Sequence, residues 1–373
     1  MNADARAWAY LSRVAEPPCP ELADLVTRVG AREAADRVRR GAVGERLAFH
    51  TEARRDIDCA QDDLDAVERL GGRIVTARDD EWPALAFSAF GRSARPRECH
   101  PPLVLWVVGE VRLDEVPGRA AAVVGTRAAT AYGEHVAADL SAGLAARDVA
   151  VVSGGAYGID GVAHRAALAS DGLTVAVLAA GVDVPYPAGH TALLRRIAEE
   201  GLVVSEYPPG VRPGRLRFLT RNRLVAALSG ATVVVEAGAR SGAASTAGWA
   251  RTLGRTVCAV PGPVTSSVSV GCHRLLRDGN AELVTRAEDV VELVGRMGEL
   301  APEEQRPTSP LDGLDEAQRR VYDALPARGA RTLDEVAVAA GLPGPRVIGP
   351  LAAMEIAGLV TQRDGRWKLV RHR

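Results

Sequence analysis

From Gly71 onward, short runs of β-branched and other apolar residues alternate with longer alanine-rich stretches. Because the apolar runs are continuous, they predict strands buried on both faces, at 103–108, 121–124, 149–152, 174–178, 202–205, 232–235 and 257–260. The stretches between them have helical periodicity, at 132–147, 161–169, 190–200, 221–228 and 245–253. This alternation predicts the α/β class, with an extended Rossmann-like, doubly wound and mostly parallel sheet.

Segments of a different texture flank this Rossmann-like domain, which we expect to cover residues 71–298. Residues 1–70 predict a small N-terminal helical domain, with helices at 22–29, 31–40 and 62–70. Residues 299–313 combine prolines with acidic residues and have no apolar period, so they predict a linker. Residues 314–373 predict helices at 315–325, 332–340 and 345–357 and a hairpin of 359–362 with 367–370, the pattern of a winged helix.

The charge balance gives no global case for a nucleic-acid partner, because 46 basic residues face 47 acidic ones. A basic surface must therefore be local, and it must consist of arginine, since Lys368 is the only lysine. The five cysteines form no Cys-x-x-Cys pair, which favours a reducing cytoplasm and no metal site. No apolar run approaches the ~18 residues that a membrane span needs, so we expect no membrane partner.

Three glycine-rich turns directly follow predicted strands. Glycine lets the backbone approach a phosphate, and the helix that follows offers free N–H groups and the positive end of its dipole. Two of the turns also carry an arginine, Arg127 and Arg240, which favours phosphate binding over mere chain reversal. The candidate residues in these turns are Gly125, Thr126 and Arg127, then Ser153, Gly154 and Gly155, and finally Arg240, Ser241, Gly242 and Thr246.

A local basic stretch precedes the third turn. It holds Arg212, Arg215, Arg217, Arg221 and Arg223, and Phe218 stands in its middle. Arginines can follow a phosphate backbone while an aromatic ring stacks on an unpaired base. The alternative is a solvated arginine-rich loop in which Phe218 fills a gap in the core.

Signals for catalysis or for a cofactor are weaker. The glycines at 154–158 are too compressed for G-x-G-x-x-G, and neither a Walker A sequence nor a G-x-S-x-G elbow occurs. Asp160 and His164 share one helix face, where a helix cap and a packed histidine are the simpler interpretation. Glu206 and Glu236 end strands, and they are either catalytic acids or acceptors for backbone amides. We therefore predict no cofactor and no enzyme.

In this order, the motifs resemble the DNA processing protein A (DprA/Smf) family over about 71–294. The matching segments are Gly125-Thr126-Arg127, 153–160 with Ala163-His164, Ala180-Gly181-Val182-Asp183 with Tyr186-Pro187, 205–210, Phe218 with Arg221-Asn222-Arg223, Val235-Glu236-Ala237, Ser241-Gly242 with Thr246-Ala247, and Ala259-Val260-Pro261-Gly262. The helical front resembles the family's SAM or helix-hairpin-helix domain more weakly, and the tail resembles its DML1-like winged helix.

The resemblance implies a cytoplasmic, homodimeric protein that binds single-stranded DNA. Such a protein protects incoming strands and helps to load RecA recombinase in natural transformation (competence) and DNA recombination. Arg127, Arg240, Arg221 and Arg223 would then bind phosphates, and Phe218 would contact a base. Asn222 and the segment 241–246 would line the pocket.

The chain departs from the family pattern at several positions. Leu219 stands where a proline is usual, and Ala243-Ala244 where Ser-Leu is usual. One alternative is a nucleotide-processing enzyme of the lysine-decarboxylase-like type, but no glutamate follows the comparable turn at 241–246. Another is a winged-helix transcription regulator, although 346–351 offers little for reading base edges.

Overall fold

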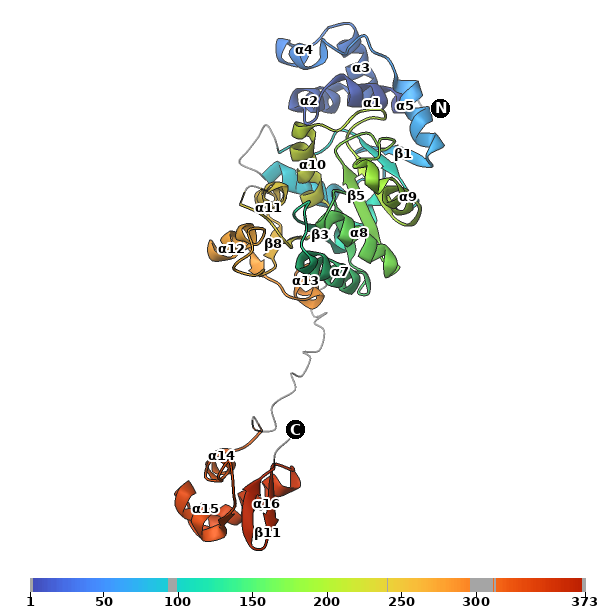
Figure 1. Ribbon diagram of the computed structural model, residues 1–373. Helices are drawn as coiled ribbons and strands as arrows, with labels where there is room; N and C mark the ends of the chain where they lie inside the picture. Colours follow the sequence, from blue (N-terminus) through green and yellow to red (C-terminus); the bar gives the residue numbers. More distant parts are fainter. Residues whose placement is uncertain (1–2, 93–98, 240, 296–310, 312, 371–373) are drawn as a thin grey trace. The chain divides into compact units, whose positions relative to one another are not determined.

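The computed structural model describes residues 3–92, 99–239, 241–295, 311 and 313–370 (Figure 1). By their internal contacts, the residues form two compact units, 1–301 and 302–373. We describe each unit by itself. Among the described residues, no single helix is long and apolar enough to cross a bilayer, and one helix pair passes that test only with a bend of 103°.

The first unit is built on a nine-stranded sheet with the order β1-β2-β6-β5-β4-β3-β7-β8-β9. The seven strands β6, β5, β4, β3, β7, β8 and β9 are parallel to one another. Strand β2 is antiparallel to β6, and β1 is antiparallel to β2. The predicted doubly wound, mostly parallel sheet is confirmed. The strands are β1 Gly72–Val75, β2 Leu105–Val108, β3 Ala120–Val124, β4 Ala150–Ser153, β5 Thr174–Leu178, β6 Leu202–Ser205, β7 Ala231–Val234, β8 Thr256–Ala259 and β9 Glu282–Leu283.

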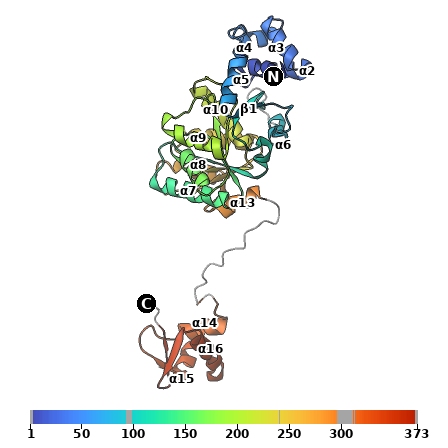
Figure 2. The same cartoon turned by 90° about the vertical axis from the view of Figure 1, so that its right-hand side faces the viewer.

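Helices cover both faces of the sheet (Figures 1 and 2). Successive side chains of a strand point to opposite faces of the sheet, and in β3 both sets are apolar. Ala121 and Val123 pack in one core, and Ala122 and Val124 pack in another on the opposite face. The first core is closed by helices that include α7, α8 and α13, and the second by helices that include α10, α11 and α12. The helices that follow β1 are α6 Ala84–Phe87, α7 Ala131–Ala145, α8 Ile159–Ala169, α9 Thr191–Glu200, α10 Arg215–Ala227, α11 Gly242–Thr252, α12 Val270–Arg277 and α13 Ala287–Val294.

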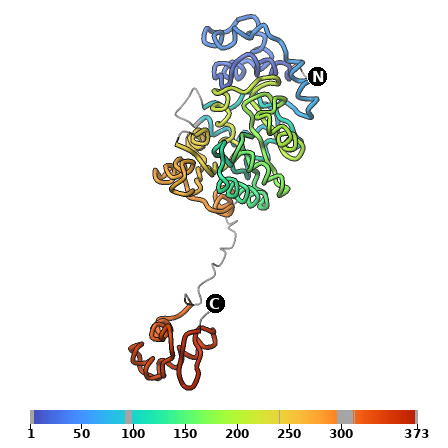
Figure 3. The backbone as a smooth tube through the Cα atoms, viewed as in Figure 1, coloured from blue at the N-terminus to red at the C-terminus, as the bar shows by residue number. Residues whose placement is uncertain are grey.

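The N-terminal helical segment belongs to the same compact unit (Figure 3). It packs on the strands through a core shared with Trp106 and Val108 of β2. Arg13 adds a polar link, because its guanidinium pairs with Asp63 at 2.5 Å and donates to the Pro209 carbonyl oxygen at 2.6 Å. Its helices are α1 Ala3–Val14, α2 Pro20–Val29, α3 Ala31–Arg39, α4 Glu45–Thr51 and α5 Ala60–Arg69.

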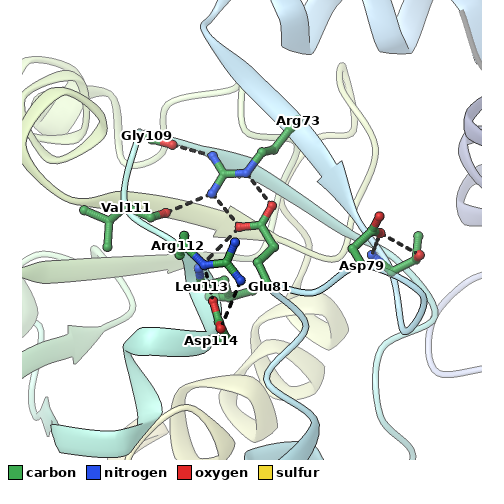
Figure 4. Close-up of polar contacts among 9 residues, drawn as sticks. Arg73, Asp79, Glu81, Gly109, Val111, Arg112, Leu113 and Asp114 are labelled. Atoms are coloured by element: carbon green, nitrogen blue, oxygen red, sulfur yellow. Dashed lines mark hydrogen bonds and ion pairs between the residues drawn. The ribbon is translucent and has the colours of Figure 1, made fainter.

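An ion pair holds the edge strand β1 in place (Figure 4). Arg73 of β1 donates to both carboxylate oxygens of Glu81 at 2.6 Å. The same guanidinium donates to the carbonyl oxygens of Gly109 at 2.5 Å and Val111 at 2.8 Å, just after β2. One planar arginine thus joins β1 to the segment that leaves β2, which local sequence patterns cannot reveal.

The second unit is a winged helix. It holds α14 Glu316–Asp323, α15 Leu333–Ala340 and α16 Gly344–Ile356, with a small sheet of β10 Arg331–Thr332, β12 Arg366–Leu369 and β11 Val360–Arg363. Asp315 and Thr332 close capping boxes that begin α14 and α15, and both helices start where we predicted within a residue. The predicted linker 299–313 lies almost entirely outside the described residues.

Helix α10 is the main departure from the predicted elements. It begins at Arg215 rather than at 221, so the arginine-rich stretch is largely helical and not a loop. Arginine and leucine favour helices. We nevertheless predicted no helix before residue 221, because this highly charged stretch also fits a solvated loop. The short strands β1, β9 and β10 were also missed.

Candidate nucleic-acid interface

The candidate site lies where the direction of the sheet's winding reverses. The chain runs outward from β3 through β4, β5 and β6, then returns to β7 on the other side of β3 and continues to β8 and β9. Ligands of open α/β sheets bind at the carboxyl ends of the strands at such a switch point. A cleft of about 770 Å³ is present there, and all three predicted glycine-rich turns contribute to its walls.

The first turn presents an exposed arginine beside two aromatic rings. Thr126 is fixed because its N–H donates to the Glu236 carbonyl oxygen at 2.8 Å and its own carbonyl accepts from Ile159 N at 3.2 Å. Arg127 follows and is exposed, with its guanidinium carbon 5.1 Å from the centre of the Phe218 ring. The Tyr186 ring lies 5.6 Å from Phe218. Charge and aromatic surface therefore meet at one wall of the cleft.

Hydrogen bonds from the buried Arg221 stabilise the second turn. Its guanidinium donates to the carbonyl oxygen of Gly154 at 2.7 Å and to that of Val177. The Asp160 carboxylate accepts from Gly154 N at 3.2 Å and from Ala156 N at 3.4 Å. A side chain at Gly154 would meet the Arg221 guanidinium at 2.4 Å, so it would force this buried, hydrogen-bonded group to move.

Burial dominates the electrostatics beneath this turn. It raises the pKa of the Asp160 carboxyl, while the Arg221 charge acts in the opposite direction. Burial likewise lowers the pKa of the Arg221 guanidinium, against the favourable charge of Asp160. The Arg221 charge therefore favours the ionised form of the buried Asp160 carboxyl, against the effect of burial.

The third turn begins α11 at the cleft. The Ser241 hydroxyl caps the helix by accepting from Ala244 N at 3.3 Å, and Gly242 and Thr246 line the cleft beside it. Asn222 of α10 donates to the Gly242 carbonyl oxygen at 3.4 Å, which joins the two helices. The end of α11 that faces the cleft is its N-terminus, where the dipole favours an anion. Arg240 lies outside the described residues.

The five arginines of the basic stretch have different roles. Arg221 and Arg223 are buried, and Arg223 pairs with the buried Glu206 at 2.7 Å. Arg217 pairs with Glu16 of the N-terminal segment. Arg212 and Arg215 are exposed and form no ion pair with any described residue. We predicted that Arg221 and Arg223 bind phosphates. In the structure both side chains are buried and have protein partners, and Arg221 lines the cleft only from beneath the second turn.

Two further predicted site residues do not line the cleft. The Ser153 hydroxyl is fully buried and donates to the Val123 carbonyl oxygen at 2.6 Å. Gly155 serves the turn with a φ of +67°. Conversely, the cleft includes Tyr186, which we did not select, and Arg215, which we named only as part of the basic stretch. Tyr186 was visible in the sequence only as part of the Tyr186-Pro187 motif.

The candidate acids and bases have structural partners. The Glu236 carboxylate, 1% exposed, accepts from Thr130 N at 3.0 Å and from its hydroxyl at 2.6 Å, so it caps α7 together with Thr130. His164 is fully buried, and its Nδ1 lies 2.7 Å from the Thr174 hydroxyl. The lining of the cleft thus offers guanidinium groups, aromatic rings, and hydroxyl and amide side chains.

Comparisons with known proteins agree with this architecture. Residues 73–295 match the family model of DNA recombination-mediator protein A, and residues 305–366 match the DprA winged helix domain. The chain is 70% identical over 373 residues to the putative DNA processing protein DprA of Mycobacterium tuberculosis, covering 100% of this chain and 96% of the relative. It is 38% identical over 277 residues to protein Smf of Escherichia coli, covering 72% of each.

Two solved structures are similar to the chain. DNA processing protein A of Streptococcus pneumoniae matches with a TM-score of 0.63 and 29% identity, over 78% of this chain and 97% of that one. The Helicobacter pylori protein, whose structure concerns its single-stranded DNA binding mode, matches with a TM-score of 0.51 and 29% identity, over 59% of this chain and 94% of that one. With its Rossmann-like sheet, its three glycine-rich turns and its winged helix, the chain belongs to the DNA recombination-mediator protein A (DprA/Smf) family.

Proposed function

We propose that this protein binds single-stranded DNA, without strong sequence preference, in the cleft at the switch point of the sheet. The observation that carries the proposal is the wall where the exposed Arg127 adjoins the rings of Phe218 and Tyr186. The N-terminus of α11 and the exposed Arg215 add positive potential to the same cleft. A positively charged groove with aromatic rings is the arrangement that binds unpaired strands through phosphates and base faces.

Single strands fit this wall better than a duplex. A ring can stack only on a base whose face is free, and the bases of a duplex are already stacked on each other. The Helicobacter pylori relative, 29% identical, is described by its single-stranded DNA binding mode, which supports the same ligand here. For the phosphates we favour Arg127, Arg215 and the turns at 125–127 and 241–246. Asn222 and Thr246 complete the lining, and Arg240 stays in the proposal on sequence grounds.

A binding role is favoured over catalysis. Glu206, Glu236, His164 and Asp160, the groups that could have served as acids or bases, all have structural partners. We further propose, from the family resemblance, a cytoplasmic homodimer that protects incoming strands and helps to load RecA recombinase. The domain boundaries that we expect, after 70, 298 and 313, belong to the same proposal.

The winged helix is proposed to contact protein rather than read DNA sequence. The exposed positions of α16 include Ile348, Ala352 and Ile356, with Ile356 90% exposed, and Arg346 is the only exposed arginine of this helix. A recognition helix instead needs side chains that hydrogen-bond to base edges, such as arginine or asparagine.

The decisive experiment compares binding of a single-stranded oligonucleotide and of the matching duplex across a salt series. We expect the full chain to prefer the single strand, with log K falling by about 0.7 per neutralised phosphate for each unit of log salt concentration. Arg127→Ala should weaken binding and reduce that slope, because one phosphate contact is lost. Arg165→Ala, which removes an exposed arginine of α8 that does not line the cleft, is the matched control. Unchanged binding by Arg127→Ala would contradict the assigned site.

A further inference from the structure

A second cleft of about 880 Å³ lies on the other side of α10. Helices α10 and α11 form two of its walls, and they lie side by side (Figure 1). The segment Glu16–Pro18 of the N-terminal helical part and Tyr207, just after β6, complete the lining. Its size is within the range of small-molecule sites, and none of the functions proposed above uses it.

Two residues of this second cleft carry buried polar atoms without partners. Arg223 is fully buried, and its Nε and Nη1 have no hydrogen-bond partner among the described residues, although its Nη2 donates to Glu206 at 2.7 Å. Tyr207 is 2% exposed, and its hydroxyl also lacks a partner within the described parts of the chain. Buried donors without acceptors are costly, so their presence in the wall of a cleft points to a ligand with acceptor atoms.

The rest of the lining is apolar, aromatic and open. Trp249 of α11 is half-buried, while Leu216 and Leu219 of α10 are 76% and 46% exposed. Gly248 of α11 has no neighbour within 4 Å of where its side chain would stand, so the helix surface there is free. A flat apolar ligand with polar edges would find both contact area and hydrogen-bond donors here.

The second cleft adjoins the first. Gly214, Arg215 and Leu219, at the start of α10, line both. Arg215 is exposed at this shared rim, and Arg217 adds a second positive charge that Glu16 partly neutralises at 2.5 Å. A strand with its phosphates on the rim could therefore reach both sides of α10.

We propose that the second cleft receives an unstacked nucleobase of the same DNA strand that occupies the first cleft. Trp249 supplies a stacking face, and the Tyr207 hydroxyl in the wall of the cleft donates to an acceptor atom of the base. Arg215 holds a phosphate between the two clefts. The inference rests on the proposed function, since it extends the same strand over the first turn of α10.

The test measures how affinity rises with strand length. Full-length protein is titrated with oligothymidylates from about 4 to about 16 nucleotides, the range of site sizes for single-strand binding folds. Gly248→Leu fills the second cleft and leaves the first intact. We expect this variant to bind the short strands with the affinity of the unmodified protein. Its affinity for the long strands should be roughly tenfold lower than that of the unmodified protein, as for one lost stacking contact.

Two further variants keep the test interpretable. Gly349→Leu makes the same change on exposed α16, where no atom lies within 4 Å either, and should leave the length dependence unchanged. If Gly248→Leu does not fold, Tyr207→Phe decides, because it removes only a hydroxyl without a described partner and should reduce the gain with length. If Gly248→Leu, or Tyr207→Phe in its place, shows the same rise in affinity with strand length as the unmodified protein, the second cleft is not a base site. If neither short nor long strands bind the unmodified protein, the proposed function itself fails.

Discussion

The guanidinium carbon of Arg127 lies 5.1 Å from the centre of the Phe218 ring, although the two residues come from different elements of the fold. Arg127 belongs to the turn after β3, and Phe218 to the first half of α10. A nucleotide combines a phosphate with a flat base, and this pair offers a partner for each. Cation–π attraction also holds the arginine toward the cleft in the absence of DNA.

Replacing Phe218 should weaken binding of single-stranded DNA without unfolding the protein. Phe218 is only partly buried, so Phe218→Leu keeps apolar volume and removes the stacking face. We expect affinity to fall by about 1 kcal/mol or more, or about five-fold or greater, and Phe218→Trp to retain it. Fluorescence anisotropy with a labelled oligonucleotide measures both. Phe49→Leu, at a phenyl group 83% exposed on α4, is the control and should bind normally.

A methyl group at Gly154 should disturb the second turn. The added carbon would stand 2.4 Å from the Arg221 guanidinium, which must then release the carbonyl oxygen of residue 154. We expect Gly154→Ala to destabilise the fold by about 1–3 kcal/mol and to weaken DNA binding. Gly118→Ala, where no atom lies within 4 Å, should change stability by less than about 0.5 kcal/mol in the same urea titration. Equal stability of the two variants would show that the turn can adapt.

Glu236 should matter for stability and not for chemistry. Glu236→Gln replaces a carboxylate oxygen facing the Thr130 N–H or hydroxyl by an amide group, so one acceptor at the start of α7 is lost. We expect a loss of about 1–3 kcal/mol in unfolding free energy and normal DNA affinity in the folded protein. The exposed Glu134→Gln on the same helix is the control, with a much smaller loss. Normal stability together with lost DNA binding would place Glu236 in the site after all.

The buried His164 should make the free energy of unfolding depend on pH. Burial first, and then the charges of His190 and Arg221, lower the pKa of His164 from 6.5 to about 3. Between these values the unfolded chain binds a proton at His164 that the folded chain does not, so the contribution of His164 to stability falls as the pH falls, by about 1.4 kcal/mol per pH unit. Urea unfolding at pH 7 and pH 5 measures this slope.

The variant His164→Gln should reduce that slope, because the side chain no longer titrates. Its overall stability at pH 7 should also fall, since the contact of 2.7 Å with the Thr174 hydroxyl is altered. His135→Gln changes an exposed histidine of α7 and should keep the slope of the unmodified protein. If His164→Gln and His135→Gln showed the same slope, His164 would not be the residue responsible.

Much of the fold could be predicted because its signals are local. The strand 174–178 was predicted with the same bounds as β5, since a continuous apolar run between turn residues has few other interpretations. Glycines after such strands located the three turns, because the carboxyl ends of parallel strands meet at one edge of a sheet. The edge strand β1 was missed, since it is short and depends on Arg73, whose acceptors include Glu81 and Gly109.

The sequence by itself therefore determined the alternation of the seven main strands with their helices, the three turns and the arginine-rich stretch. Only the tertiary structure decided which arginines remain available to a ligand. Arg215 and Arg221 are close in sequence, but one is exposed at the cleft and the other is buried under Gly154. The sequence shows where each arginine stands in the chain. Whether that arginine can reach a ligand depends on which face of α10 packs in the core, and segments distant in the sequence determine that face.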